Sequence, residues 1–330
     1  MKAVVIARFG GPEVLELRDR PTPAPARGEV RIRVHATAVN RADLLQRQGQ
    51  YPAPTDAPAD IPGLEFAGEV DAIGESVADL AVGDRVFGLC GGGAYAEAIA
   101  VPARTAVKLP EGMSWEEGAA VAEAFITAWD ALVIQARLVA GETVLIHGAG
   151  SGVGTAAIQI ARAIGARAVG TSRTPDKLER ARALGLDQGV AIGAGGGGGG
   201  FADAVLRATG GRGADVVLEL VGGPYLAEDL LCVAPRGRIM LVGVMGGGRV
   251  ELDLKLLLQR RIQLTGTVLR ARPLEEKIAA VQQLGRHLVP LFARGALRPI
   301  VDRVLPLAEA AAAHAYVASN VSFGKVVLRV

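Results

Sequence analysis

The sequence predicts an α/β fold in which a doubly wound parallel sheet is joined to a β-rich domain. Three observations lead to this prediction. Residues 1–120 contain many short strand-like segments separated by glycine, strand and helix patterns alternate from Ser114 onwards, and Thr143–Gly165 reads as a strand, a glycine-rich turn and a helix. Alternation of strands and helices is typical of a parallel sheet with right-handed crossovers, whereas many short strands divided by turns favour a compact barrel-like domain.

Length and composition narrow the class of protein. A chain of 330 residues is long for one hydrophobic core, so two domains are expected. A net charge of +2 and an aromatic content of 4% argue against a nucleic-acid partner and against an anionic membrane surface. The two cysteines, Cys90 and Cys232, exclude a disulfide framework and a four-cysteine zinc site and favour a reducing cytoplasm. No run of 18 apolar residues occurs, so no membrane span is expected.

The first region alternates apolar and polar residues with the period of two that strands show. Glu29–Ala38 places charged residues between apolar ones, as expected of a strand with one solvated face. Pro21–Pro25 reads as an extended linker. Strands are predicted at Val4–Ile6, Val14–Arg18, Glu29–Ala38, Glu65–Gly74, Arg85–Gly88 and Ala94–Ala100.

From Ser114 the pattern becomes helical, with one helix expected around residues 115–124 and a second at Thr127–Val139. The strands that follow are short apolar runs, which are typical of a parallel sheet covered on both faces. Strands are predicted at Thr143–Ile146, Ala168–Thr171, Val216–Leu220, Ile239–Val242 and Gln263–Thr267, and helices at Pro175–Leu184, Leu226–Leu231 and Leu252–Gln259. After Arg272 the alternation stops, so a tail with one long helix and a final strand, Lys325–Val330, is expected to pack back on the first domain.

The glycine-rich turn has the geometry that receives a pyrophosphate. Thr143–Ile146 has the pattern of a buried strand, and apolar residues recur at helical spacing after the turn. A helix start offers backbone N–H groups and a partial positive charge to an anion, and small residues allow close approach. The pattern Ala149-x-Ser151-x-x-Gly154 is a variant of the glycine fingerprint of Rossmann-type folds, so a dinucleotide site is predicted here.

The residues after the second strand of this fold select the cofactor. An acid at that strand end accepts hydrogen bonds from the ribose 2′-hydroxyl of NAD. Here Ala168–Thr171 is followed by Ser172 and Arg173, with Lys177 four residues further on and no acid at the strand end. Two charge-assisted contacts to a 2′-phosphate would favour NADPH about ten- to a thousandfold. The alternative interpretation is a solvated basic helix start.

The sequence gives little evidence for catalysis by a metal ion or by a nucleophilic serine or cysteine. Metal catalysis needs convergent ligands, and the four histidines show no paired spacing. They are His35, His147, His287 and His314. His147 precedes the glycine turn and is interpreted as a structural residue. Ser151 lacks the flanking residues of a nucleophile elbow. Cys90 is interpreted as a small buried hydrophobic residue. We therefore expect the chemistry to rest on a bound cofactor.

A series of short motifs follows in order along the whole chain. They are Asn40–Leu44 (NRADL), Arg47–Tyr51 (RQGQY), Pro62–Glu65, Gly83–Val86, Gly91–Glu97, Ser151–Gln159, Met245–Gly248, Leu269–Arg272 and Gly324–Leu328. Together they resemble the zinc-free quinone oxidoreductase (zeta-crystallin-like) branch of the medium-chain dehydrogenase/reductases, and most closely its p53-inducible subgroup. Zinc-dependent relatives carry a cysteine and a Gly-His-Glu ligand sequence where this chain has Asn40 and Gly63-Leu64-Glu65, so no metal site is expected.

This resemblance implies a domain plan and a set of site residues. Residues 1–122 with 268–330 would form a β-rich, GroES-like catalytic domain, and residues 123–267 a Rossmann dinucleotide-binding domain. NADPH would lie in a cleft between them. The residues implied to bind it are Asn40, Tyr51, Thr127, Ser151, Gly152, Val153, Gly154, Ser172, Arg173, Lys177, Val221, Gly222, Gly243, Met245, Leu269, Arg270, Gly324 and Lys325. Asn40 and Tyr51 are also implied to be catalytic, orienting the acceptor, with Tyr51 or water as the source of a proton.

The expected activity is hydride transfer from NADPH to a quinone by a homodimer. Reduction of enals, enones or enoyl thioesters is an alternative, and a non-catalytic, RNA-binding role is a second one. One departure from the family pattern follows Ala191-Ile192, where a polar residue and a tyrosine are usual. This chain has Gly193-Ala194 and then the run Gly195–Gly200, which reads either as a flexible surface loop or as residues left unassigned.

Overall fold

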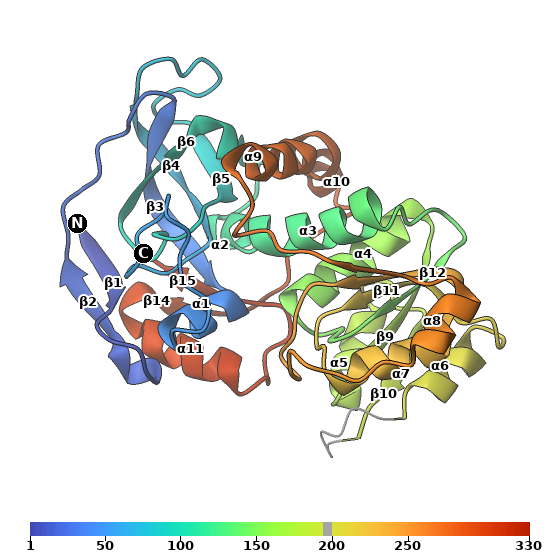
Figure 1. Ribbon diagram of the computed structural model, residues 1–330. Helices are drawn as coiled ribbons and strands as arrows, with labels where there is room; N and C mark the ends of the chain where they lie inside the picture. The colour runs from blue at the N-terminus through green and yellow to red at the C-terminus, as the bar shows by residue number, and fades with distance from the viewer. Residues whose placement is uncertain (194–199) are drawn as a thin grey trace. The chain divides into compact units, whose positions relative to one another are not determined.

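The computed structural model describes residues 1–193 and 200–330. The chain divides into two compact units, Met1–Ile126 with Leu269–Val330, and Thr127–Val268, and each is described by itself (Figure 1). The assignment of catalytic and dinucleotide-binding roles to the predicted domains stays a prediction, because a division into compact units assigns no function. The predicted loop at Gly195–Gly200 lies outside the described residues except for Gly200.

The first unit is built on a seven-stranded sheet in the order β14-β15-β3-β4-β5-β7, with β6 also paired to β3. A separate pair, β1 and β2, is antiparallel. The strands are β1 (Lys2–Ile6), β2 (Leu15–Asp19), β3 (Glu29–Val39), β4 (Glu65–Ile73), β5 (Arg85–Leu89), β6 (Ala98–Pro102), β7 (Ala106–Lys108), β14 (Val301–Pro306) and β15 (Lys325–Arg329). The helices are α1 (Arg41–Arg47), α2 (Trp115–Ala119), α9 (Leu274–Gln283), α10 (Val289–Ala293) and α11 (Ala310–Ala318), and α3 (Ala122–Trp129) continues into the second unit.

The chain's last strand lies beside one of its first. β15 pairs antiparallel with β3, so that Val326 lies opposite Val39 and Leu328 opposite Thr37. Both strands carry buried apolar residues, which places this pairing in the core of the first unit. The end of the chain therefore belongs to the same sheet and the same compact unit as β3.

The second unit is a six-stranded parallel sheet in the order β10-β9-β8-β11-β12-β13. Numbered within the unit, this is 3-2-1-4-5-6, the order of doubly wound dinucleotide folds, and it confirms the predicted fold class. The strands are β8 (Thr143–Ile146), β9 (Arg167–Ser172), β10 (Gln188–Ala191), β11 (Ala214–Glu219), β12 (Val233–Leu241) and β13 (Gln263–Gly266). The helices are α4 (Gly152–Ile164), α5 (Pro175–Arg182), α6 (Ala202–Ala208), α7 (Pro224–Cys232) and α8 (Leu254–Arg260).

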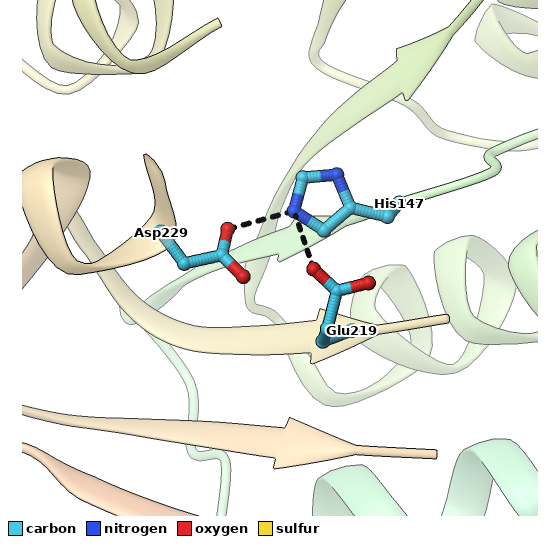
Figure 2. Close-up of side chains that lie close together, drawn as sticks. All are labelled: His147, Glu219 and Asp229. Carbon is cyan, nitrogen blue, oxygen red and sulfur yellow. Dashed lines mark hydrogen bonds and ion pairs between the residues drawn. The ribbon is translucent and has the colours of Figure 1, made fainter. Parts of the chain in front are cut away.

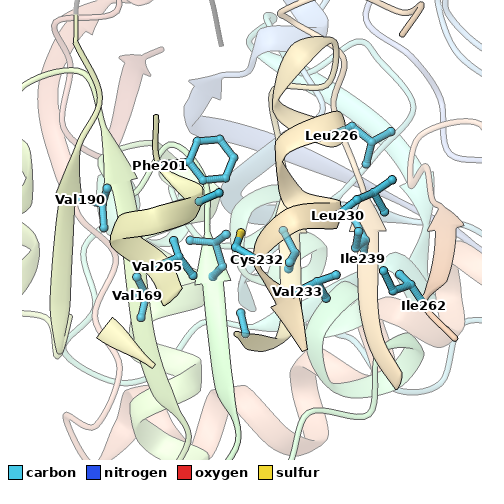
Figure 3. Packing of buried hydrophobic residues seen from close by; sticks show 14 of the residues in the cluster. Val169, Val190, Phe201, Val205, Leu226, Leu230, Cys232, Val233, Ile239 and Ile262 are labelled. Carbon is cyan, nitrogen blue, oxygen red and sulfur yellow. The ribbon is translucent and has the colours of Figure 1, made fainter. Parts of the chain in front are cut away.

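The core of the second unit lies between the sheet and its helices (Figure 3). Phe201 and Val205 of the α6 region pack against Leu226 and Leu230 of α7 and against the strand residue Ile239. Phe201 is fully buried, so its truncation to alanine is expected to cost about 3–5 kcal/mol of unfolding free energy. This core fixes the sheet whose strand ends carry the candidate site.

Several elements differ from the sequence prediction. The helices α1, α6 and α11 and the strand β14 were not predicted, and the strand expected at Ala94–Ala100 runs from Ala98 to Pro102 instead. α11 has alanine at six of its nine positions, so it lacks the apolar periodicity that reveals an amphipathic helix. α1 is short, but its N-terminal cap, in which the Asp43 carboxylate accepts a hydrogen bond from the Asn40 N–H, is a signal that sequence reasoning missed.

Across residues 1–193 and 200–330, no helix combines the length and the apolar character that a membrane span needs.

Candidate active site

The glycine turn follows β8 and opens α4. Ser151 is the N-cap of the helix, and its Oγ accepts a hydrogen bond from the Gly154 N–H at 3.0 Å. The Ala149 N–H donates to the Thr171 carbonyl at 2.9 Å and so ties the turn to the end of β9. The turn therefore has a fixed position at the carboxyl edge of the sheet, where ligands bind in open α/β folds.

Gly154 is where the turn and the helix come closest. A Cβ added there would lie 2.3 Å from the Gly148 carbonyl oxygen, so only glycine fits without a backbone shift. The N–H groups of Gly152 and Val153, at the first two helical positions, have no acceptor within the helix. These two half-buried donors and the helix dipole form a cradle for an anion, as the pyrophosphate prediction requires.

The residues predicted to meet a 2′-phosphate lie at the next strand end. Ser172 ends β9, and its Oγ accepts a hydrogen bond from the Thr174 N–H at 3.2 Å. Arg173 is exposed directly after the strand, and Lys177 lies half-buried in the first turn of α5. β9 and β8 are parallel neighbours, so this basic segment and the glycine turn lie at one edge of the sheet.

The loops after β11 and β12 meet at the same edge. The Gly246 N–H donates to the Val221 carbonyl at 2.6 Å, and a Cβ on Gly222 would lie 2.9 Å from the Val244 Cα. A Cβ added to Gly243 would likewise lie 2.6 Å from the Leu220 carbonyl oxygen. The structure thus brings together the two loops predicted to line the ribose and nicotinamide, with Met245 exposed beside them.

A buried polar cluster lies beneath these loops (Figure 2). His147, directly after β8, has its Nε2 2.8 Å from Asp229 Oδ1 and 3.7 Å from Glu219 Oε2, and all three residues are fully buried. Its Nδ1 lies 2.9 Å from the Thr171 hydroxyl. We assign the ring proton to Nε2, because that nitrogen faces two carboxyl groups and Nδ1 then accepts from Thr171. His147 is the structural residue that the sequence suggested.

The cluster connects to the cofactor loops through Glu219. Its Oε1 accepts hydrogen bonds from the backbone N–H groups of Val221 and Gly222, the latter at 2.8 Å. Burial raises the pKa of the Glu219 and Asp229 carboxyls and lowers that of His147. The cluster therefore keeps a proton on its carboxyl groups and stays nearly neutral, which limits the cost of burying it.

By residue type, this cluster would suit a metal ion. Zinc ligands in a tetrahedral site lie about 3.3 Å apart, given bonds of about 2.0 Å. The 2.8 Å between His147 Nε2 and Asp229 Oδ1 matches instead a hydrogen bond between a ring N–H and a carboxyl oxygen. The arrangement is that of a structural hydrogen-bond network.

In the first unit, Asn40 and Lys325 meet across the β3–β15 pairing. Lys325 Nζ lies 2.5 Å from Asn40 Oδ1, 2.8 Å from Glu65 Oε1 and 3.3 Å from the Val39 carbonyl. Asn40 Nδ2 donates to Glu65 Oε1 at 2.9 Å. Glu65 is fully buried, so Lys325 supplies the counter-charge that its ionised form needs. The position of a metal-binding glutamate in zinc-dependent relatives is thus taken by an ion pair.

Tyr51 and Arg270 form a second contact of the predicted site. The Arg270 guanidinium lies 5.4 Å from the centre of the Tyr51 ring and donates to the Tyr51 carbonyl at 3.4 Å. It also donates to the Gly91 carbonyl and to Gln46 Oε1, each at 2.7 Å. Arg270 is buried, so these bonds fix the loop that carries Tyr51.

Sequence reasoning missed two acidic residues of this region. Asp43 is fully buried, and its carboxylate accepts hydrogen bonds from the Asn40 and Gly63 N–H groups; burial raises its pKa to about 6. Glu123 is the second residue of α3, and its backbone N–H donates to Glu65 Oε2 at 2.8 Å. The signal for Glu123 was present, because it is the one charged residue within Ala119–Trp129.

The remaining predicted residues are placed as follows. Thr127 lies half-buried on α3, Leu269 is buried at the start of the tail, and Gly324 precedes β15 with a φ of +95°. Cys90 is half-buried after β5, and its thiol lies 3.3 Å from the Gly63 carbonyl. Burial raises the thiol pKa to about 12, so Cys90 stays a thiol and is no nucleophile.

The two folds and the glycine-turn site define a class, the medium-chain dehydrogenases and reductases. Residues 26–111 match the alcohol dehydrogenase GroES-like domain, and residues 152–286 match the zinc-binding dehydrogenase domain. Asn40 and Leu64 replace the usual zinc ligands of that class, as the resemblance indicated.

The comparisons then narrow the class to one family. The quinone oxidoreductase of Sus scrofa is 35% identical over 99% of this chain and 97% of its own length. That of Pseudomonas aeruginosa is 36% identical over 99% of both. The crystal structure of Escherichia coli quinone oxidoreductase complexed with NADPH has a TM-score of 0.89 and 28% identity, covering 100% of both chains. The chain belongs to the zinc-free quinone oxidoreductase family.

Proposed function

We propose that this protein is an NADPH-dependent oxidoreductase that transfers a hydride to a quinone without a metal. The observation that carries the proposal is the anion cradle at Gly152–Gly154, closed by the tight contact between Gly154 and Gly148, beside a strand end with basic residues and no acid. An acid at that strand end would select NAD, whereas Arg173 and Lys177 suit a 2′-phosphate. The full-length similarity to quinone oxidoreductases supports the acceptor.

The residues of the second unit fit NADPH. The N–H groups at the start of α4 would hold the pyrophosphate, Ser172, Arg173 and Lys177 the 2′-phosphate, and the loops at Val221–Gly222 and Gly243–Met245 the ribose and nicotinamide. When bound, NADPH supplies the hydride. Glu219 holds the first of these loops through two backbone N–H groups, so the loop is preorganised before the cofactor arrives.

Asn40 and Tyr51 are proposed to orient the acceptor. The side-chain amide of Asn40 is held by hydrogen bonds to Lys325 and Glu65. We therefore propose that it acts as a rigid side chain of fixed orientation against which the acceptor lies. Tyr51 is half-buried beside Arg270 and presents a hydroxyl that can donate a hydrogen bond to a quinone oxygen. Tyr51→Phe is expected to raise the KM for quinones several-fold; unchanged acceptor binding and turnover would exclude this role.

The activity is tested by following NADPH absorbance with a panel of quinones, enones and enoyl thioesters. Faster turnover of quinones than of the other acceptors is expected. A preference for enoyl thioesters or enones would assign the chain to that chemistry instead. Failure with every acceptor, together with salt-dependent binding of RNA, would contradict an enzymatic role.

Cofactor choice is tested separately by titrating NADPH and NADH. NADPH is expected to bind about ten- to a thousandfold more tightly. Lys177→Glu is expected to weaken NADPH while leaving NADH within about twofold, and Glu179→Gln, a change on the same helix, is the control. Equal dissociation constants for the two cofactors in the wild type would refute the assignment to Arg173 and Lys177.

A homodimer in the cytoplasm is proposed as the working form. β13 is the edge strand of the six-stranded sheet, and its four residues are all exposed. Leu254 and Leu258 of α8, 65% and 72% exposed, add apolar surface in the same unit. Both cysteines are free thiols, which suits a reducing compartment. Sedimentation of the wild type and of Leu264→Asp, a β13 variant, tests the dimer; a monomeric wild type would exclude it.

A further inference from the structure

Two buried carboxyl oxygens face each other beneath the cofactor loops of the second unit (Figure 2). Asp229 Oδ1 lies 2.8 Å from His147 Nε2. Glu219 Oε1 accepts hydrogen bonds from the Val221 and Gly222 N–H groups. In the part of the chain that the structure describes, the second oxygens, Asp229 Oδ2 and Glu219 Oε2, are buried and have no hydrogen-bond partner. Buried acceptors left unsatisfied are costly, so a donor between these two oxygens is expected.

A single proton supplies that donor. A carboxylate only accepts hydrogen bonds, whereas a carboxylic acid also carries one O–H donor. With the proton on Glu219 Oε2, this O–H donates to Asp229 Oδ2. Asp229 Oδ1 still accepts from the His147 ring, and Glu219 Oε1 still accepts from the loop. Every oxygen of the two carboxyl groups then has a partner.

The surroundings favour this protonated form. Burial raises the pKa of both carboxyls to about 8, and the hydrogen bond between them raises the pKa of Glu219 while it lowers that of Asp229. The other titratable groups that act on the pair are His147 after β8, and Glu228 and Tyr225 of α7. Glu228 adds negative charge. His147 and Tyr225 stay neutral, because burial lowers the pKa of the first and raises that of the second.

We propose that Glu219, held in its protonated form by Asp229, is a positioning residue for NADPH at the Val221–Gly222 loop. This inference rests on the proposed function. Glu219 holds one side of the loop, and the Gly246 N–H, which donates to the Val221 carbonyl at 2.6 Å, holds the other. Release of the proton to water would leave two carboxylates against each other beneath a site for an anionic cofactor. Their repulsion would displace Glu219 together with the loop, so NADPH affinity is linked to one buried proton.

The test measures the NADPH dissociation constant against pH by fluorescence titration. In the wild type it is expected to rise by up to about tenfold per pH unit above about pH 8. Glu219→Gln places an amide N–H where the acid has its O–H, so this variant is expected to bind NADPH within about threefold of the wild type at pH 7 and to show no rise. Glu251→Gln, an exposed loop residue of the same unit, is the control and should keep the wild-type profile.

A fragment of the cofactor separates positioning at this loop from a general loss of structure. The compound 2′,5′-ADP carries the adenosine and the 2′-phosphate but lacks the nicotinamide half, which the Val221–Gly222 loop is proposed to line. Its dissociation constant is expected to stay within about twofold over the same pH range. An equal rise for 2′,5′-ADP and NADPH would place the effect outside this loop and overturn the inference.

Infrared spectroscopy supplies a readout that needs no cofactor. The difference between wild type and Glu219→Gln at pH 7 is expected to show a protonated carboxyl band, which disappears with a midpoint near pH 8. Absence of this band, a flat wild-type profile for NADPH, or a rise that persists in Glu219→Gln would overturn the inference while leaving the proposed function intact. A wild type that binds no NADPH at any pH would overturn both.

Discussion

Gly154→Ala is the sharpest test of the cofactor cradle. The added Cβ would lie 2.3 Å from the Gly148 carbonyl oxygen and 3.0 Å from the Ala149 backbone, whereas real Cβ contacts almost never fall below 3.0 Å. The turn and the helix start must therefore separate by at least about 0.7 Å. Without this contact the substitution would be stabilising, because alanine is favoured over glycine in a helix by about 1 kcal/mol.

The magnitude follows from the donors that this shift moves. A displacement of this size lengthens a hydrogen bond of about 2.9 Å beyond 3.5 Å, where it no longer counts as one. Losing one or two bonds to a charged phosphate, each about 1.5–3 kcal/mol, weakens NADPH binding roughly ten- to a thousandfold. The strain is also expected to lower the unfolding free energy by about 1–3 kcal/mol.

The assay is a fluorescence titration of NADPH with a thermal melt of each variant. Gly285→Ala is the control, because its Cβ would meet Val107 Cγ1 at an ordinary 3.5 Å. It should leave both the dissociation constant and the melting temperature near the wild-type values. A Gly154→Ala protein that binds NADPH within about threefold of the wild type, with an unchanged melting temperature, would refute the reasoning.

Two further predictions concern the buried charges. Lys325→Met leaves Glu65 buried without its counter-charge and should lower the unfolding free energy by about 3–5 kcal/mol, as measured by urea titration. Adding Glu65→Gln to this variant should recover part of the lost stability. No recovery in the double variant would contradict the ion-pair argument. The raised pKa of Asp229 means that the folded protein keeps a proton which the unfolded chain releases, so stability should fall as the pH rises from 5 to 8, by up to about 1.4 kcal/mol per pH unit for each such carboxyl. Asp229→Asn should flatten this slope, whereas an unchanged slope would place the proton elsewhere.

The second unit was predictable because its signals are local. A buried parallel strand is a continuous apolar run, and the glycine turn, the N-cap Ser151 and the small residue Gly154 all lie within a few positions of one another. The tail was predicted less well. The long helix of the tail was predicted, but β14 and α11, which follow it, were not. The alanine-rich sequence of α11 shows no helical period of apolar residues, so its structure depends on packing within the first unit.

The sequence by itself determined the fold class, the family and the position of the dinucleotide cradle, since each depends on motifs or periodic patterns whose own residues lie close together in the chain. Only the tertiary structure decided which charges meet. Asn40 and Lys325 are 285 residues apart and come together because β15 pairs with β3, and Glu123 gains its acidic neighbours from β4 and α1. His147 and Asp229 likewise meet across 82 residues. The physical reason is that a pKa or a buried ion pair depends on burial and on neighbours in space, which local sequence patterns do not contain.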